Sequence, residues 1–290
     1  MTVARGFAPL TTDGAGIEAA WGDRAGPVPV AAAFLAELDT VTVGRLLAEP
    51  SLRPPRISFA RDGRQIPDRE VTAGSGPPGP PGGAPLDREK AAALVAAGAT
   101  VMVYGAQRVV PSLGRITGHI AASLRASCDT TVFHTPAGNP GLGWHRDGQH
   151  VVAVQIGGSK EWRVERRAPE YWWTTGALRS DGPDTEVDRI TLRPGEALYM
   201  PPGVAHTARA TDESSTHVSF VVQEPATREL ALALFERASR SVGTRLDRGP
   251  VAGRKERAAA VARELASAVA ALDVNELLGL VEADAMESGG

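Results

Sequence analysis

The sequence predicts a mainly β protein: a double-stranded β-helix, or jelly roll, with flanking helices and a C-terminal helical appendix. Short strand-like runs separated by Gly and Pro turns crowd the middle of the chain, which is typical of a barrel or jelly roll. Helical periodicity replaces this pattern near Pro225. We therefore expect N-terminal helices, first strands and a Pro/Gly-rich loop in residues 1–98, the jelly-roll core in residues 99–225, and a helical region in residues 226–290.

The first elements are expected to be helices followed by one strand pair. Residues 1–29 are rich in Gly, Ala and Pro and are mostly irregular in pattern. Apolar residues at helical spacing in residues 29–52 predict two short helices. In residues 56–66 the pattern alternates around Asp62-Gly63, a pair that favours a tight hairpin turn. The first strand pair of the chain is therefore expected in residues 56–66.

Residues 74–85 read GSGPPGPPGGAP and predict a surface loop, because Pro and Gly sustain neither a helix nor a strand ladder. Asp87 is placed to cap an Ala-rich helix that Gly98 ends. A strand is predicted over 99–105 and an amphipathic helix over 110–127. The strands expected after this helix are 129–135, 149–156, 160–166, 187–192, 197–200 and 216–223.

The C-terminal region repeats Ala, Leu, Arg and Glu with a period near 3.6. Its apolar stripe consists of Ala260, Val261, Leu265, Val269 and Leu272. We favour packing of this stripe on its own chain, and a homodimer through the C-terminal helices is the alternative.

Composition limits the partners and the compartment. The 290 residues carry 31 basic and 34 acidic side chains, a formal net charge of −3, so nothing global favours nucleic acid or a membrane surface as a partner. The single cysteine, Cys128, forms no internal disulfide, and the sequence shows neither a secretory h-region nor a membrane span. A cytoplasmic location is expected.

Three side chains carry the predicted chemistry. His145 and Asp147 are two residues apart on an apparent strand, so both side chains point to one face of the sheet. The segment RPGEALYMPPGVAHTA shapes a strand and a tight turn that deliver His206. Two neutral imidazoles and one carboxylate on one face of an iron ion leave positions open for a chelating cosubstrate and for O₂. The pattern indicates the facial triad of a non-haem Fe(II) oxygenase.

Lys160 is the candidate anion-binding residue. It follows Gly157-Gly158, which we interpret as the turn of a hairpin that doubles back toward the metal strand. A lysine that points inward there is an unpaired buried cation unless an anion meets it. A dicarboxylate would satisfy it.

The segment from Gly195 to His206 resembles the second sequence motif of the cupins, a glycine and a five-residue spacer followed by P-x-G-x-x-H. The first cupin motif has two histidines and a glutamate, whereas this chain has His145 and Asp147 there. This departure favours an oxygenase over a four-ligand cupin.

The stretch VFHTPAGNPGLGWHRDGQHVVAVQIGGSKEWRV, with that motif and STHVSF, resembles the JmjC-domain oxygenases of the cupin-4, or ribosomal-oxygenase, group over the central third of the chain. The resemblance implies that His145, Asp147 and His206 bind Fe(II). It also implies that Lys160 anchors 2-oxoglutarate as cosubstrate. The family's tyrosine near this anion is replaced by Phe133, and the residues considered as substitutes are Thr131, Thr135 and Ser219.

The implied activity is a 2-oxoglutarate-dependent dioxygenase that hydroxylates a polypeptide side chain, or a peptide or natural product, with release of succinate and CO₂. The alternatives are a non-redox metal-dependent cupin (an isomerase or lyase) and a metal-free cupin binding module. Lys160 and Asp147 argue against the former, and the complete triad argues against the latter.

Other conspicuous side chains have blander interpretations. Arg146 is expected to face away from the metal and to be solvated, and His150 to face away and serve solvent or packing contacts. Cys128 is expected to be inert. The aromatic residues Trp162, Tyr171, Trp172 and Trp173 either line a substrate groove or fill a core.

Overall fold

The computed structural model describes residues 3–8, 10–11, 15–39, 41–73, 84–168, 178–179, 182–224, 227–240, 242, 253–273 and 279. The chain divides into two compact units. The first comprises residues 1–124 and 128–223 and holds all the described strands. The second comprises residues 125–127 and 224–290.

The N-terminal elements include the two predicted helices and the predicted hairpin. In chain order the helices and strands are α1 (Val3–Gly6), α2 (Ala15–Ala20), β1 (Gly26–Pro29), α3 (Ala32–Glu37), α4 (Val43–Ala48), β2 (Ile57–Arg61), β3 (Arg64–Ile66), η1 (Asp68–Glu70), α5 (Arg88–Ala96), β4 (Thr100–Tyr104), η2 (Ala106–Arg108) and α6 (Pro111–Leu124). Asp62 and Gly63, with φ of 52° and 72°, make the turn between β2 and β3. The Asp87 side chain accepts a hydrogen bond from Lys90 N, which confirms the predicted cap of α5.

The remaining strands and the last helices follow. They are β5 (Ser127–Thr135), β6 (His145–Arg146), β7 (His150–Gly157), β8 (Lys160–Glu165), β9 (Leu178–Arg179), β10 (Val187–Leu192), β11 (Glu196–Met200), β12 (Ala205–Ala210), β13 (Ser215–Gln223), α7 (Thr227–Ser239) and α8 (Arg254–Ala270). The helix predicted over 110–127 ends earlier, because Arg125 has a left-handed φ of 51° and β5 begins at Ser127.

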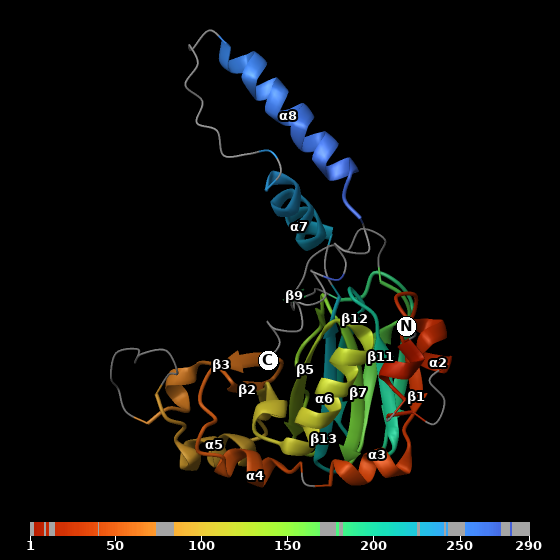
Figure 1. The fold of residues 1–290 in the computed structure, drawn as a ribbon. Helices are drawn as coiled ribbons and strands as arrows, with labels where there is room; N and C mark the ends of the chain where they lie inside the picture. Colours follow the sequence, from red (N-terminus) through yellow and green to blue (C-terminus); the bar gives the residue numbers. More distant parts are fainter. Residues whose placement is uncertain are drawn as a thin grey trace. The chain divides into compact units, whose positions relative to one another are not determined.

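Two sheets form the jelly roll that the sequence predicts (Figure 1). The larger sheet has the order β1-β11-β7-β13-β5-β4-β2-β3, and the smaller has the order β10-β8-β12-β6-β9. Strand β1 was not predicted because it contains Pro27 and Pro29. It is tolerated because it lies at the sheet edge, where proline costs no central ladder bond.

The predicted hairpin around Gly157-Gly158 is wrong. Strand β7 pairs with β11 and β13, whereas β8 pairs with β10 and β12, so the chain crosses here from one sheet to the other. Gly158 has a φ of 57°, and a Cβ on it would lie 1.9 Å from the Ser214 carbonyl oxygen. The glycine therefore permits a sharp crossover against a neighbouring backbone, and Lys160 begins the strand on the other side.

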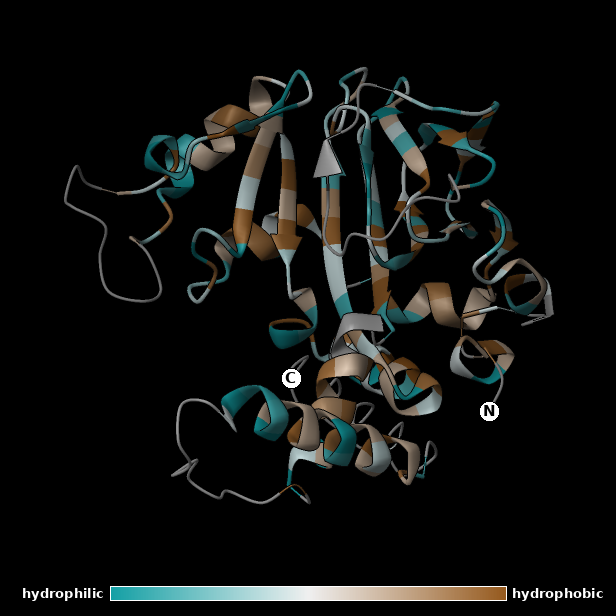
Figure 2. Cartoon of the chain, turned by 90° about the horizontal axis from the view of Figure 1, so that it is seen from above, coloured by the Kyte–Doolittle hydropathy of each residue, from teal (hydrophilic) through white to brown (hydrophobic). Residues whose placement is uncertain are grey.

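Apolar side chains from both sheets meet in the core. One cluster consists of Val151, Ala153, Trp162, Val164, Leu192, Leu198, Met200 and Val204. In Figure 2 the strands carry bands of hydrophobic residues, in brown, that alternate with paler and hydrophilic ones. On the outside of the larger sheet, the hydroxyl groups of Thr117 in α6 and Thr130 in β5 form a hydrogen bond of 2.6 Å. The interior between the sheets is thus apolar except where the residues described below enter it.

The described residues of the second unit form two helices, α7 and α8, which contact each other. Ala238 is buried there, whereas Leu232, Phe235 and Val261 are exposed. Of the predicted stripe, Ala260 and Val261 are exposed and the other three residues are half-buried. None of the helices in the described ranges is long and apolar enough to cross a membrane.

Candidate metal centre

The three predicted ligand residues lie together at one end of the smaller sheet. His145 in β6 is the register partner of His206 in β12, and Asp147 follows directly after β6. One potential ligand atom from each of the three residues lies within 4.8 Å of the other two. The imidazole centroids of the two histidines are 4.1 Å apart, and Asp147 Oδ2 is 3.6 Å from His206 Nε2. Residues 61 positions apart in the chain thus share one small volume because their strands are adjacent.

Both imidazoles are oriented in the same way, by a hydrogen bond from Nδ1 to the backbone carbonyl oxygen two residues earlier. Nδ1 of His145 lies 2.9 Å from the Gly143 carbonyl oxygen, and Nδ1 of His206 lies 3.1 Å from the Val204 carbonyl oxygen. A carbonyl only accepts, so each Nδ1 carries the proton and each Nε2 has a free lone pair. Such a hydrogen bond from the second nitrogen is the usual way in which proteins orient a metal-binding histidine.

The protonation state of His206 also suits a ligand. The side chain is buried, and burial, followed by the neighbouring His145, lowers the pKa of His206 to about 4. A buried imidazole loses the hydration that stabilises its cation. The neutral form that binds metals is therefore the one present at neutral pH.

The backbone of Asp147 is tied to the turn before β12. Gly203 N donates to the Asp147 carbonyl oxygen at 2.7 Å. Gly203 has a φ of 84°, a left-handed value that glycine adopts without strain. The P-x-G-x-x-H motif thus holds Asp147 and presents His206 with the same turn.

A cavity of about 310 Å³ opens beside these three residues, between the two sheets. The larger sheet contributes Thr131, Phe133, Val151, His217, Ser219 and Val221, and the smaller contributes Lys160, Trp162, His206 and Ala208. The walls are mainly apolar, with a few polar groups. Such a cavity suits a small polar ligand with an apolar middle.

Lys160 lies in the wall of this cavity and is fully buried. Its Nζ donates to Thr135 Oγ1 at 3.0 Å and lies 3.2 Å from His217 Nδ1. In the described part of the chain no carboxylate lies within ion-pair distance of it. Burial lowers the pKa of Lys160 to about 7. The arrangement leaves a buried cationic donor that a ligand carboxylate would stabilise.

Comparison with known proteins shows which family this region is similar to. Residues 103–230 match the family model described as a JmjC domain, and that range includes the three ligand candidates and Lys160.

Among its curated relatives, ribosomal oxygenase 2 of Bos taurus is 33% identical over 123 residues, 42% of this chain and 27% of the relative. The ribosomal protein uL16 3-hydroxylase of Escherichia coli is 33% identical over 100 residues, 34% of this chain and 26% of that protein. The chain therefore spans about a quarter of the length of the curated relatives it matches.

Solved structures show the same fold. The X-ray structure of E. coli YcfD superposes with a TM-score of 0.59 at 17% identity, covering 91% of this chain and 69% of YcfD. YcfD in complex with cobalt and 2-oxoglutarate gives a TM-score of 0.53 at 17% identity, covering 88% and 67%. The structural similarity between this chain and YcfD extends well beyond residues 103–230, which match the family model.

The other predicted cosubstrate residues divide into two groups. Thr131, Phe133 and Ser219 line the cavity. Thr135 instead lies behind Lys160, where its hydroxyl accepts the lysine hydrogen bond and is also bonded to Thr100. Thr135 therefore helps to hold the Lys160 side chain in place.

His217 is a cavity residue that the sequence interpretation did not place in the site. It is buried, stacks on Phe133 with ring centroids 4.7 Å apart, and contacts Lys160. Burial, followed by the charge of Lys160, lowers the pKa of His217 well below its usual value, so the ring is neutral. Strand parity could have found it, since it lies two residues before Ser219, which was already a candidate, and side chains two residues apart on a strand face the same side.

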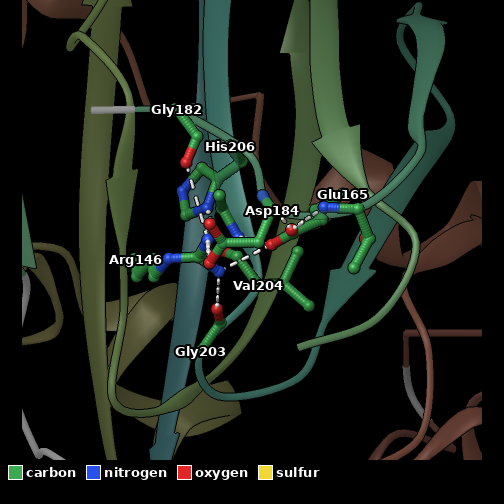
Figure 3. A network of polar contacts seen from close by, with 9 residues as sticks. Arg146, Glu165, Gly182, Asp184, Gly203, Val204 and His206 are labelled. Atoms are coloured by element: carbon green, nitrogen blue, oxygen red, sulfur yellow. Dashed lines mark hydrogen bonds and ion pairs between the residues drawn. The ribbon is translucent and has the colours of Figure 1, made fainter. Parts of the chain in front are cut away.

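The prediction that Arg146 is solvated is wrong. Its side chain does not line the cavity, but it is only 5% exposed. It donates to Glu165 Oε2 and to the Gly203 carbonyl oxygen, both at 2.6 Å, and forms an ion pair with Asp184 at 2.9 Å (Figure 3). The outer face of the smaller sheet is covered here by residues 182–185, which strand parity alone does not reveal.

His150 faces away from the site, where it bonds the Tyr199 hydroxyl at 2.9 Å and stacks on Trp21. Trp162 lines the cavity, and its buried Nε1 has no hydrogen-bond partner among the described residues. Cys128 is buried, and burial raises the pKa of its thiol, in agreement with an inert side chain. Tyr171, Trp172 and Trp173 lie outside the described residues.

Proposed function

We propose that this protein is an Fe(II)- and 2-oxoglutarate-dependent oxygenase whose iron is held by His145, Asp147 and His206. The observation that carries the proposal is the convergence of these three donors beside a cavity that contains the fully buried Lys160. Both imidazoles have their Nε2 lone pairs available, because their Nδ1 atoms face backbone carbonyls. Two histidines and a carboxylate with adjacent open space are the donor set of non-haem Fe(II) oxygenases.

The cavity residues suit a dicarboxylate cosubstrate. Lys160 would bind the carboxylate distal to the metal, and Trp162 Nε1 is a second buried donor without a partner in the described ranges. Apolar walls around Phe133 and Val151 would exclude water from the methylene groups between the two ends. The solved complex of E. coli YcfD with cobalt and 2-oxoglutarate, which has the same fold, supports this assignment.

When bound, Fe(II) would supply the oxidation of 2-oxoglutarate by O₂ to succinate and CO₂, coupled to hydroxylation of a substrate C–H bond. The protein's own residues orient the reactants. His145, Asp147 and His206 occupy one side of the metal, and Lys160 positions the cosubstrate. The neutral His217 and Thr135 keep the lysine side chain in place through contacts at 3.2 Å and 3.0 Å.

The substrate in this proposal is a side chain of a polypeptide. The names of the relatives, ribosomal oxygenase 2 and ribosomal protein uL16 3-hydroxylase, support this class. A peptide or natural-product substrate is the variant within the same chemistry. We place the activity in the cytoplasm, since the single, buried Cys128 gives no reason for an oxidising compartment. A homodimer through the C-terminal helices stays a prediction, to which the exposed Leu232, Phe235 and Val261 contribute apolar surface.

The test uses the whole chain, purified without oxygen and supplied with Fe(II) and 2-oxoglutarate. On admission of O₂ we expect succinate to form, with more in the presence of cell extract that contains polypeptide substrates. His145→Ala should reduce the rate at least a hundredfold, whereas Glu161→Gln, a half-buried residue elsewhere on β8, should leave it unchanged. Wild-type protein that forms no succinate beyond the His145→Ala level would favour the binding-module alternative.

A further inference from the structure

Arg146 and Glu165 form a buried ion pair directly behind the three candidate ligands. Glu165 is 0% exposed and Arg146 is 5% exposed. Arg146 lies between His145 and Asp147 in the sequence, and its register partner Ala205 precedes His206. Arg146 is thus next to two candidate ligands in the sequence, and both Arg146 and Glu165 lie diagonally across a strand pair from the third, His206.

The strand pairing that brings the ligands together is very short. Strand β6 has two residues, and its register with β12 consists of His145↔His206 and Arg146↔Ala205. A pairing of only two residue pairs has few hydrogen bonds, so by itself it leaves the backbone of β6 considerable freedom to move relative to β12. Metal affinity, in contrast, requires ligand atoms to be placed within a few tenths of an ångström. Additional restraints are needed at this point of the sheet.

The Glu165 carboxylate supplies such restraints by joining three chain segments. Its Oε2 accepts from Arg146 and from Ala205 N, at 2.6 Å and 3.1 Å. Its Oε1 accepts from Asp184 N and Thr185 N, at 2.6 Å and 2.7 Å. Each hydrogen bond to an ionised acceptor is stronger than a neutral one. The carboxylate therefore fixes β6, β12 and the segment of residues 184–185 to one another.

Arg146 completes the connection on the side of Asp147. Its guanidinium donates to the Gly203 carbonyl oxygen at 2.6 Å, while Gly203 N donates to the Asp147 carbonyl oxygen at 2.7 Å. The guanidinium also reaches the Gly182 carbonyl oxygen and Asp184 (Figure 3). The planar guanidinium holds these acceptors in fixed directions, which a lysine ammonium does not do.

Resting on the proposed function, we propose that Arg146 and Glu165 are positioning residues for the metal site. They hold the backbones that carry His145, Asp147 and His206 in the arrangement that binds the metal. Neither side chain lines the cavity. Their loss should therefore weaken metal binding without removing any ligand.

The experiment measures binding of Co²⁺ to the whole protein, by its visible absorption spectrum and by titration, alongside thermal unfolding of the metal-free protein. The variants are Glu165→Gln, Arg146→Lys and the double variant Arg146→Gln with Glu165→Gln. The double variant removes both charges and keeps hydrogen-bonding groups, so neither charge is left buried without its partner. Glu161→Gln on the same strand is the matched control.

We expect Glu165→Gln and the double variant to bind Co²⁺ about tenfold to a hundredfold more weakly, as when the support of a metal ligand is removed. The absorption spectra of their Co²⁺ complexes should also change in shape. For the double variant, we expect both the weaker binding and the changed spectrum even if its unfolding midpoint equals that of the wild type. Glu161→Gln should match the wild type, and Arg146→Lys should recover only part of the affinity.

A folded double variant with wild-type Co²⁺ affinity and spectrum would overturn the proposal and leave the pair a structural one. If the single variants fail to fold, the double variant alone decides between these outcomes. If none of the three folds, although Glu161→Gln does, the pair is required for folding and the positioning role is rejected. Wild-type protein that binds no Co²⁺ would instead overturn the metal site, and with it the proposed function.

Discussion

Lys160 combines an energetic cost with a proposed task. Its ammonium is fully buried against Thr135 and His217, and burial lowers its pKa to about 7. In the metal-free protein, a cation in this position is disfavoured until an anion arrives. In the proposed function, Lys160 serves ligand binding at the expense of the stability of the empty protein.

Lys160→Met should separate these two effects. We expect the metal-free variant to unfold at a higher urea concentration than the wild type, by about 1–2 kcal/mol, because an unpaired buried amine is replaced by an apolar chain of similar length. The same variant should lose at least a hundredfold in affinity for 2-oxoglutarate in the presence of Mn²⁺, measured by calorimetry. A variant that is less stable and still binds the keto acid would contradict both parts.

The lowered pKa also predicts how stability depends on pH. The unfolded chain keeps Lys160 protonated up to a pKa near 10.5, whereas the folded protein loses this proton near pH 7. Between these values the unfolded state binds more protons, so this group makes stability rise with pH, by at most about 1.4 kcal/mol per pH unit.

Urea unfolding of metal-free wild type and Lys160→Met at pH 7, 8 and 9 measures this effect. The stability advantage of the variant should shrink at each step, because the wild type gains stability that the variant cannot gain. A constant difference across the three pH values would show that Lys160 has its ordinary pKa when folded.

At the scale of elements, the crossover between β7 and β8 places Lys160 in the cavity. Gly158 has a left-handed φ of 57°, and the Ser214 carbonyl oxygen occupies the space of a side chain there. The crossover leads directly into the first residue of β8. The backbone at this glycine is therefore coupled to the position of the lysine.

Gly158→Ala should destabilise the protein by at least about 1 kcal/mol and weaken 2-oxoglutarate binding, since the backbone must shift to accept the methyl group. Gly138→Ala is the control, because Gly138 also has a left-handed φ, 69°, but has open space at the Cβ position. Chemical unfolding and calorimetry compare the two variants. Equal effects would show that the φ strain, not the contact with Ser214, decides the cost.

At the scale of the whole molecule, the residues proposed to bind the metal and the cosubstrate come from both sheets. Lys160 and His206 lie in the smaller sheet, whereas Phe133 and Ser219 lie in the larger one. A ligand that contacts both sheets binds only the folded molecule. Binding should therefore stabilise the fold by mass action.

Mn²⁺ together with 2-oxoglutarate, each at a hundred times its dissociation constant, should stabilise the protein by about 2.7 kcal/mol or more. A thermal shift measurement should show a larger increase with both than with either alone, and a chelator should reverse it. Asp147→Ala, which removes a proposed ligand, should abolish the increase. An unchanged increase in that variant would place the metal elsewhere.

Local patterns were sufficient for much of the fold. The Asp62-Gly63 turn, the Asp87 cap and the alternating strands depend on interactions between residues close in the chain, and each is confirmed. The candidate ligands could also be named, because two residues on one strand and one motif histidine have chemistry that is visible in sequence. His217 and the β1 edge strand were missed, because one lacks a distinctive motif and the other contains prolines.

The sequence by itself determined the jelly-roll class, and it was enough to name the three proposed donor residues and the lysine proposed to bind an anion. Only the tertiary structure decided that β7 and β8 belong to different sheets, that Arg146 is buried against Glu165, and that His217 contacts Lys160. The physical reason is that these features depend on contacts between distant segments. Strand parity gives the direction in which a side chain points, whereas the segment that covers it is decided by how the whole chain packs.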